Sequence, residues 1–230
     1  MVHVHVYNFY LRVRKEEFEM TISEELNESI LQGDERRVIQ IVEGAVKSKV
    51  PVKEILNEGL IGAMNIVGTK FKNCELYVPE VLKAARAMKS GIEVIRPLLE
   101  KAGVETLGKV VIGTVKGDLH DIGKNLVAML VEGSGFEIVN LGVDVPPEKF
   151  VDAAKAKEVK ICMMSALLTT TMPAMRDTIE ALKEAGLGGK VKTMIGGAPV
   201  TKKFADEIGA NGFGSNAAEA VDVAKRLIRD

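Results

Sequence analysis

A short loop containing acidic and imidazole side chains follows an apolar run near the middle of the chain. The run is Val110-Val111-Ile112-Gly113-Thr114-Val115, and the loop is Gly117-Asp118-Leu119-His120-Asp121-Ile122-Gly123. A histidine that binds a metal through one ring nitrogen usually donates its other N–H to a carboxylate, which fixes the tautomer. Asp118 is close enough to His120 in sequence to accept that bond. The loop is therefore a candidate metal-binding site.

Two glycines flank this pair of residues. Gly117 and Gly123 remove side chains where a bulky ligand must approach the backbone, or where the loop needs a positive φ. A plainer interpretation also remains open, because short motifs arise by chance. In that interpretation Asp118 caps the helix that follows, and His120 is an ordinary surface residue.

The second half of the chain alternates between apolar runs and amphipathic segments, which is typical of strands followed by helices. The Ile/Val-rich runs lack strict alternation, as parallel strands covered on both faces should. The expected strands are 109–115, 136–141, 160–165, 191–195 and 212–214, and the expected helices are 122–133, 147–156, 172–185, 201–208 and 217–228. Five such units predict an α/β domain with a flavodoxin-like (Rossmann-like) parallel sheet of order 2-1-3-4-5.

This strand order has a consequence for the candidate site. In an open parallel sheet, ligands bind beyond the carboxyl ends of the strands, where the strand order reverses. Here that point lies between the first and third strands. The loop with Asp118 and His120 and the loop from Ser165 to Thr171 are therefore expected to meet there.

The first half of the chain has a helical pattern. We expect a four-helix bundle over residues 21–100, a linker at 101–108 and the sheet domain at 109–230. Residues 1–20 differ from both and are expected to form a loosely held extension. The alternation of His3 and His5 puts both rings on one face of a strand, so a metal clasp there is an alternative.

The ends of the four helices follow from residue types. Gly33 is a typical terminator of the first helix, and Asp34 can cap the second. Pro51 and Pro79 suit the first turns of the third and fourth. Pro97 is expected to kink or end the fourth helix.

Composition narrows the function classes. The chain has 230 residues, 47% hydrophobic and 27% charged, with a net charge of -1, so no role in binding polyanions is indicated. Trp is absent and aromatics are 4%, which argues against stacking on single-stranded nucleic acid. Cys74 and Cys162 are far apart and indicate no disulfide scaffold. No apolar run approaches the ~20 residues of a membrane span, and no leader is visible, so we expect a cytoplasmic protein.

Three motifs in the second half resemble those of cobalamin-binding domains of the methionine synthase type. They are Asp118-x-His120-x-x-Gly123, Ser165-Ala166-Leu167 and Gly196-Gly197. The first half resembles the helical cap of that family in Gly62-Ala63-Met64-x-x-Val67-Gly68-x-x-Phe71 and Glu75-x-Tyr77-Val78-Pro79-Glu80-Val81-Leu82-x-x-Ala85-x-x-Met88. The resemblance covers roughly residues 22 to 228. It is strongest to the small corrinoid proteins of methanol, methylamine and methoxyaromatic methyltransferase systems.

The resemblance implies roles for three residues in the reaction. His120 would be the lower axial ligand of cobalt through Nε2. Asp118 would hold the Nδ1–H of that ring. Thr171 would extend this relay with its hydroxyl, at a position where the family commonly has Ser.

The resemblance also implies a set of cofactor-binding residues in the sheet domain and the cap. They are Gly117, Asp118, His120, Asp121, Ile122, Gly123, Ser165, Leu167, Thr169, Thr171, Gly196, Gly197, Ala198, Gly212, Phe213 and Gly214, with Met64, Phe71, Tyr77 and Val78 in the cap. Plainer alternatives remain open for several of them. Residues 169–171 suit a helix cap, 196–197 suit a tight turn, and Phe71, Tyr77 and Val78 suit an ordinary bundle core.

The function implied by the resemblance is methyl transfer through cobalamin, which would cycle between methylcobalamin and a Co(I) corrinoid. The expected partners are a substrate:corrinoid methyltransferase, a corrinoid:tetrahydrofolate or corrinoid:thiol methyltransferase, and a reductive activase. Nucleic acid and membranes are not expected partners, and the chain is not expected to turn over alone.

Three other functions remain as alternatives. They are the small subunit of an adenosylcobalamin-dependent mutase, a cobalamin-sensing domain, and a flavodoxin-like domain without cobalt. A mutase subunit need not carry the helical cap, so the Tyr77-Val78-Pro79 segment favours methyl transfer. A sensor usually adds a DNA-binding module, and the sequence has no evident helix-turn-helix.

Overall fold

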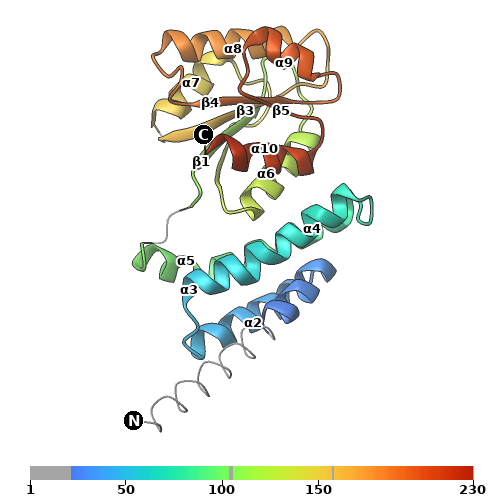
Figure 1. Cartoon of the computed structure of the whole chain (residues 1–230), viewed down its shortest axis with the longest axis vertical. Coiled ribbons are helices and arrows are strands. Elements are labelled where there is room, and N and C mark those ends of the chain that lie inside the picture. The colour runs from blue at the N-terminus through green and yellow to red at the C-terminus, as the bar shows by residue number, and fades with distance from the viewer. Residues whose placement is uncertain (1–21, 104–105, 157, 230) are drawn as a thin grey trace. The chain divides into compact units, whose positions relative to one another are not determined.

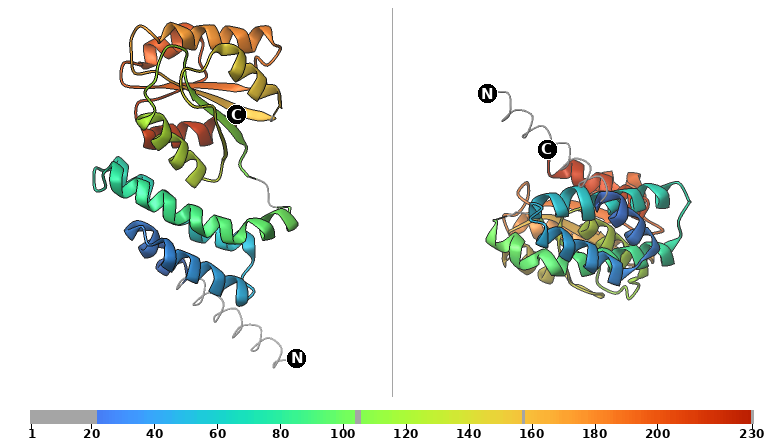
Figure 2. Two further views of the ribbon diagram at one scale, coloured as in Figure 1. Left: turned by 180° about the vertical axis from the view of Figure 1, so that it is seen from behind. Right: turned by 90° about the horizontal axis from the view of Figure 1, so that it is seen from below.

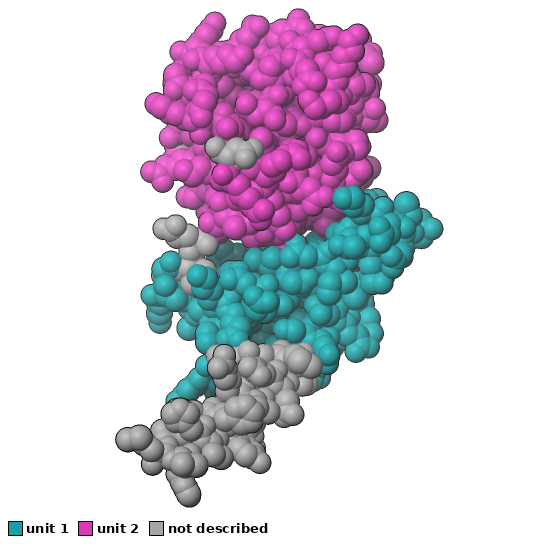
Figure 3. All heavy atoms as spheres, viewed as in Figure 1, with its two compact units in different colours: residues 1–104 teal, residues 105–230 magenta. Residues whose placement is uncertain are grey.

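The computed structural model describes residues 22–103, 106–156 and 158–229. The chain divides into two compact units, residues 1–104 and 105–230, which Figure 3 colours separately. The division falls within the expected linker at 101–108. The extension at 1–20 and its His3/His5 clasp lie outside the described residues and stay predictions.

The described part of unit 1 is helical (Figure 1). Residues 22–32 form the first helix. It is followed by α2 (Glu35–Lys47), α3 (Val52–Glu54), the π-helix η1 (Ile55–Ile61), α4 (Gly62–Lys72) and α5 (Val78–Lys101). Because α3, η1 and α4 follow one another without a break, they correspond to the third of the four predicted helices.

Local residues set the helix ends and the packing of unit 1. Gly33 has a φ of +72°, which ends the first helix in the left-handed region. The Asp34 side chain accepts the N–H of Arg37 over 3.0 Å and caps α2 as predicted. A Cβ at Gly91 in α5 would lie 2.8 Å from Leu60 and 2.9 Å from Val38, so α5, η1 and α2 are in close contact.

Pro97 does not end the fourth helix, so that part of the prediction was wrong. Helix α5 continues past Pro97 to Lys101. A proline inside a helix leaves the carbonyl four residues earlier, here that of Glu93, without its usual partner. Both residues are exposed, so water can bind that carbonyl and the helix continues at a tolerable cost.

Unit 2 contains one parallel sheet with strands β1 (Lys109–Thr114), β2 (Glu137–Asn140), β3 (Val159–Ser165), β4 (Lys192–Gly196) and β5 (Gly212–Gly214). Its helices are α6 (Ile122–Gly133), α7 (Pro147–Ala156), α8 (Pro173–Glu184), α9 (Lys202–Ile208) and α10 (Ala217–Leu227). The strand order is β2-β1-β3-β4-β5, and every pair is parallel. The predicted flavodoxin-like topology is confirmed.

Both faces of the sheet are covered by helices. One core, with Val111 and Cys162, packs against α7, α8 and α9, and the other, with Val110 and Ile161, packs against α6 and α10. Figures 1 and 2 show these two helical layers on opposite sides of the strands. Burial on both faces explains the continuous apolar runs. It also raises the pKa of the Cys162 thiol to about 12, so this cysteine is an unreactive core residue.

The carboxyl ends of the strands all lie at one edge of unit 2, because the strands are parallel. β1 lies between β2 and β3, so the β1–α6 loop has the β2–α7 loop on one side and the β3–α8 loop on the other. Among the described residues, no helix has the length and apolar character needed to cross a membrane.

Candidate functional site

Asp118 and His120 form a direct side-chain pair in the β1–α6 loop. Oδ1 of Asp118 lies 2.7 Å from Nδ1 of His120 and also accepts the backbone N–H of His120 over 3.1 Å. The Asp118 side chain is fully buried, whereas the His120 side chain is 51% exposed. A buried carboxylate therefore holds an imidazole that remains accessible from outside.

The second oxygen of Asp118 binds the loop after β3. Oδ2 accepts the backbone N–H groups of Leu167 and Leu168 over 2.7 and 3.2 Å. It also lies 2.8 Å from Oγ1 of Thr171, whose single proton is shared with the Leu168 carbonyl at 2.9 Å. The charged acceptor is favoured for that proton, because hydrogen bonds to a carboxylate are stronger than those to a neutral carbonyl. The structure thus brings together His120, Asp118 and Thr171.

These contacts determine the protonation state of Asp118. Burial alone would raise its pKa, because it disfavours the charged form. The hydrogen bonds from Leu167, His120 and Thr171 outweigh burial and lower the pKa well below its usual range. Asp118 is therefore an ionised carboxylate at neutral pH and acts only as an acceptor.

The ionised carboxylate decides which nitrogen of His120 is free. Because Asp118 can only accept, Nδ1 of His120 must carry the proton of the 2.7 Å hydrogen bond. In the neutral ring the lone pair is then on Nε2, the nitrogen that points away from Asp118. This is the arrangement of a metal-binding histidine with a carboxylate partner.

Exposed apolar side chains accompany His120 on the loops at this edge. Leu119 and Ile122, in the His120 loop, are 71% and 78% exposed. Leu167 and Leu168, whose N–H groups bind Asp118, are each 43% exposed. Large apolar side chains left in water beside a ligating group indicate a surface for a large, partly apolar ligand.

Two glycines at this edge, Gly197 and Gly123, differ in what a side chain at their positions would meet. Gly197 has a φ of +131°, and a Cβ there would lie 1.9 Å from the carbonyl oxygen of Ala166. The close approach of the β3–α8 and β4–α9 loops therefore requires glycine. Gly123, in the first turn of α6, is exposed, and a Cβ there would meet nothing within 4 Å. The protein itself does not explain why Gly123 lacks a side chain.

The other predicted residues of the β1, β3 and β4 loops lie at the same edge. Gly117 has a φ of +83°, so its loop needs a residue that tolerates the left-handed region. Asp121, Thr169 and Ala198 are exposed, and Ser165 is half-buried at the end of β3. Their contact with a cofactor stays a prediction.

Gly212, Phe213 and Gly214 have another explanation in the packing of unit 2. A Cβ at Gly212 would lie 2.7 Å from Val223, and one at Gly214 would lie 3.0 Å from Ala220, both in α10. The Phe213 side chain packs into the core under α7, α8 and α9. The packing of β5 against α10 and the core therefore explains these residue types without a cofactor.

Sequence reasoning missed a buried lysine beside the site. Lys124 of α6 is buried, and its Nζ donates to Oδ1 of Asn125 over 2.7 Å and to Oδ1 of Asn140 over 2.8 Å. Burial lowers the pKa of Lys124, and the negative charge of Asp121 offsets this only in part. The network joins the start of α6 to the end of β2. Asn125 is next to Lys124 in sequence but Asn140 is 16 positions away, so no local pattern would have revealed the network.

The four predicted cap residues differ in exposure within unit 1. Met64 is buried in the bundle, so the core interpretation accounts for it. Phe71 and Val78 are half-buried, and Tyr77 is 69% exposed between α4 and α5. An ordinary core role is therefore wrong for Tyr77, whose large ring lies on the surface of its unit.

The donor set at this edge suits one kind of metal centre. Within the described residues, no group of three or more His, Cys, Asp or Glu side chains is placed to hold a metal ion. A lone imidazole is too few ligands for a protein-built zinc or iron site. It is enough for a metal that arrives in a macrocycle with its own equatorial nitrogens. The free Nε2, the exposed leucines and the open space at Gly123 all fit such a group.

Comparison with protein families identifies the macrocycle. Residues 108–222 match the model of a B12 binding domain, and residues 22–96 match a second model with the same description. The two matches coincide with the sheet of unit 2 and the helices of unit 1. The match to unit 2 includes the β1–α6 loop with Asp118 and His120, and the loops that follow β2, β3 and β4.

Individual relatives cover nearly the whole chain. Dimethylamine corrinoid protein 3 of Methanosarcina acetivorans is 42% identical over 204 residues, 89% of this chain and 95% of the relative. Trimethylamine corrinoid protein 2 of the same organism is 45% identical, covering 88% and 94%. A chain in the methanol:cobalamin methyltransferase complex MtaBC from Methanosarcina barkeri superposes with a TM-score of 0.81 at 30% identity, covering 91% and 80%. The chain therefore belongs to the family of B12-binding corrinoid proteins, and its cofactor is a cobalamin.

Proposed function

We propose that this corrinoid protein carries a methyl group between two partner enzymes, with His120 as the lower axial ligand of cobalt. The observation that carries the proposal is the contact of 2.7 Å between the buried Asp118 carboxylate and Nδ1 of His120. It leaves Nε2 as the accessible nitrogen of a ring that is half exposed at the ligand-binding edge. When bound, the corrinoid supplies a nucleophilic metal that accepts and releases the methyl group.

The protein's own residues then control the axial ligand. Asp118 keeps the proton of His120 on Nδ1, so Nε2 presents its lone pair. When Nε2 does not bind the metal, it is also the ring nitrogen that can accept a proton. Leu167, Leu168 and Thr171 hold the carboxylate still while this exchange occurs. Ligation by His120 is therefore coupled to a proton at Nε2.

Other residues would bind and shelter the cofactor. Gly117, Asp121, Ile122, Gly123, Ser165, Leu167 and Thr169, with Gly196, Gly197 and Ala198, would line its binding surface in unit 2. Phe71, Tyr77 and Val78 of unit 1 would shield it from water and oxidants. The exposure of Tyr77 supports a role in covering a ligand, because the described residues leave this large ring 69% exposed.

The proposed methyl donor is a methylated amine, delivered by a substrate:corrinoid methyltransferase. A corrinoid:tetrahydrofolate or corrinoid:thiol methyltransferase would take the methyl group, and a reductive activase would restore the reduced metal. Support comes from relatives named for dimethylamine and trimethylamine at 42% and 45% identity. To test the donor, the reduced, cobalamin-loaded protein is mixed with a methylamine or a methanol methyltransferase and its substrate. A change of the visible spectrum with the methanol enzyme alone would contradict the proposed donor.

The axial ligand can be identified by its nuclear spin. The protein is labelled with ¹⁵N, loaded with unlabelled cobalamin and examined by electron paramagnetic resonance in the Co(II) state. A protein nitrogen bound to cobalt gives a doublet splitting, whereas the cofactor's own ¹⁴N base gives a triplet. We expect a doublet that disappears in His120→Ala.

Two further outcomes decide against the assignment. A triplet in the labelled parent protein would show that the cofactor keeps its own base. The double variant His3→Ala, His5→Ala is the control, since it removes the other two histidines of the chain. Loss of the doublet in that variant rather than in His120→Ala would place the ligand elsewhere.

A further inference from the structure

The loop after β2 is bonded to the loop that carries His120 by a reciprocal pair of hydrogen bonds. Oδ1 of Asp144 accepts the backbone N–H of Gly117 over 2.7 Å. The backbone N–H of Asp144 donates to the carbonyl oxygen of Asp118 over 3.0 Å. One residue thus holds the main chain of two consecutive residues that lie just before His120.

Asp144 adopts an unfavourable backbone conformation to make these bonds. Its φ is +51°, in the left-handed region that non-glycine residues rarely occupy. Such a conformation persists only where the surroundings enforce it. Here they do, because the Gly142 carbonyl accepts the N–H of Thr114 over 3.0 Å and Val145 bridges to Val115. The strained residue is thus held beside the end of β1.

Asp118 is consequently held at both its main chain and its side chain. The loop after β3 binds its carboxylate through Leu167, Leu168 and Thr171, and Asp144 binds its carbonyl. Thr114 Oγ1 also donates to the carbonyl of His120 over 2.8 Å. Among the described residues, Asp118 is the only side chain hydrogen-bonded to the His120 ring, so the position of the ring depends on where this main chain lies.

We propose that Asp144 is a positioning residue for the axial ligand. Asp144 holds the backbone of Gly117 and Asp118, and this keeps Nε2 of His120 in a constant position. This inference rests on the proposed ligation of cobalt by His120. Asp144 acts through the β1–α6 loop and need not touch the cofactor. Without Asp144 the His120 loop would sample several positions. Binding of Nε2 to the metal would then be weaker, because it would have to order the loop in one of them.

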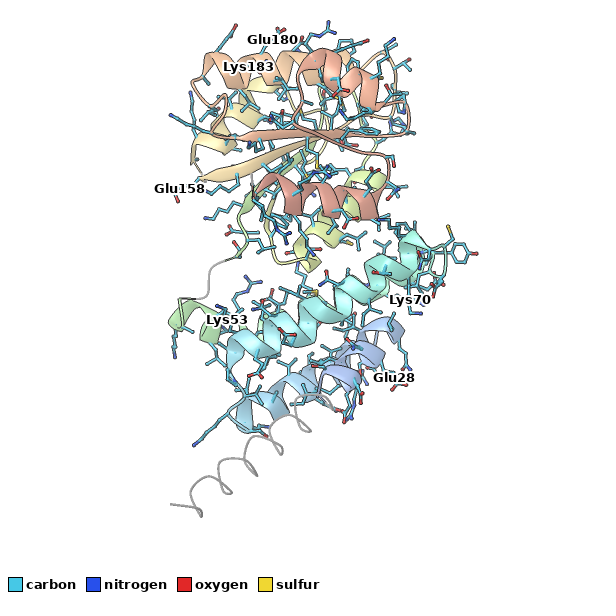
Figure 4. All side chains as sticks on the ribbon, viewed as in Figure 1. Glu28, Lys53, Lys70, Glu158, Glu180 and Lys183 are labelled. Carbon is cyan, nitrogen blue, oxygen red and sulfur yellow. The ribbon has the colours of Figure 1, made fainter. Side chains whose placement is uncertain are left out.

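Three substitutions separate the side chain of Asp144 from its backbone strain. Asp144→Asn keeps an acceptor oxygen and tolerates the left-handed region. Asp144→Gly removes the acceptor and relieves the strain. Glu158→Gly is the matched control, because Glu158 has the same φ of +51° in the turn before β3, at the opposite edge of the sheet. Figure 4 shows Glu158 pointing outward from unit 2 there.

The first measurement needs no cofactor. Amide exchange of the Gly117 N–H, followed by NMR in the cofactor-free protein, reports on the bond to Asp144. We expect exchange to be about tenfold faster in Asp144→Gly, which corresponds to the contribution of one hydrogen bond. Asp144→Asn and Glu158→Gly should exchange as the parent protein does.

The second measurement uses the ¹⁵N-labelled, cobalamin-loaded protein in the Co(II) state. In Asp144→Gly the ratio of histidine-bound to histidine-free cobalt should fall about tenfold, the factor that the lost hydrogen bond contributes. Asp144→Asn should restore the parent ratio, and Glu158→Gly should leave it unchanged. If Asp144→Gly does not fold, Asp144→Ala replaces it, since alanine also removes the acceptor but restricts the backbone more than glycine does.

A parent-like ratio of histidine-bound to histidine-free cobalt in Asp144→Gly would overturn the inference. A low ratio in Asp144→Asn would also overturn it. The His120→Ala variant separates this failure from that of the proposed function. If His120→Ala loses the doublet while Asp144→Gly keeps the parent ratio, only the role of Asp144 is wrong. If His120→Ala retains the doublet, the axial ligand itself is wrong.

Discussion

The backbone N–H of Leu167 lies 2.7 Å from Oδ2 of Asp118, the same distance that separates Oδ1 of Asp118 from Nδ1 of His120. One carboxylate therefore links the loop after β3 to the imidazole in the loop after β1. Leu167 and Asp118 are 49 positions apart in sequence. They meet because β1 and β3 are neighbours in the sheet, so the orientation of His120 depends directly on the strand order.

The stability of the protein should depend on pH through Asp118. Its pKa is lowered in the folded state, so its contribution to stability is present above the unfolded pKa of about 4 and is lost as pH falls toward the folded pKa. We expect the gap in unfolding free energy between the parent and Asp118→Asn to shrink as pH falls below about 4. Urea unfolding at a series of pH values measures this gap.

A matched carboxylate provides the control for that measurement. Asp152→Asn, on the exposed side of α7, removes one acidic group without touching the site. The unfolding free energy of Asp152→Asn should stay within about 0.5 kcal/mol of that of the parent over the same pH range. A pH-independent gap for Asp118→Asn would show that the Asp118 carboxylate is not held as the hydrogen bonds indicate.

Replacing Gly197 by alanine should be strongly destabilising. The new Cβ would lie 1.9 Å from the carbonyl oxygen of Ala166, on a backbone with a φ of +131°. Strain and overlap together should lower the free energy of unfolding by about 3 kcal/mol or more. Gly189→Ala is the control, because Gly189 has a positive φ of +81° but nothing within 4 Å of a new Cβ. It should cost about 1 kcal/mol, and equal losses would exclude the contact with Ala166 as the cause.

Replacing Gly123 by alanine should separate folding from cofactor binding. In the cofactor-free protein the Cβ has free space, and alanine favours the helix by up to about 1 kcal/mol, so the stability should hold or rise. If cobalamin lies against this turn, its affinity should fall about tenfold or more, as expected of an overlap costing about 1–3 kcal/mol. Equilibrium titration with cobalamin, followed by absorbance, measures the affinity.

Gly44 in α2 is the matched site for this substitution. A Cβ there would also meet nothing within 4 Å, so Gly44→Ala should hold or raise the stability in the same way. It should leave the affinity for cobalamin unchanged. Equal affinities for the two variants would place the cofactor away from the first turn of α6.

The exposed ring of Tyr77 should protect the reduced metal more than it stabilises the fold. Tyr77→Ala should change the free energy of unfolding by no more than about 0.5 kcal/mol, since the side chain is 69% exposed. It should speed the reoxidation of the Co(I) form by air, which stopped-flow absorbance can follow. Met64→Ala, which removes a buried side chain, should instead cost about 2–5 kcal/mol. A reoxidation rate unchanged by Tyr77→Ala would contradict a covering role.

The periodicity of the sequence was sufficient to predict the sheet order and the approximate bounds of every strand and helix in unit 2. Apolar runs of strand length and amphipathic segments of helix length are local signals, and they survive in the fold because both faces of the sheet are covered. The Asp118–His120 pair was predictable for the same reason, since its two members are two positions apart. The continuation of α5 past Pro97 was not, because it depends on which side of the helix faces water.

The contacts that hold this pair in place depend on the tertiary structure. The N–H groups of Leu167 and Leu168 are backbone groups, so no side-chain pattern marks them as the partners of Asp118. Asp144 reaches Gly117 from 27 positions away only because β2 lies beside β1. Residue types and their spacing were enough to propose His120 as a ligand with Asp118 as its carboxylate partner. The support of that ligand required the folded chain, because it comes from backbone groups and loops that meet only when the sheet has formed.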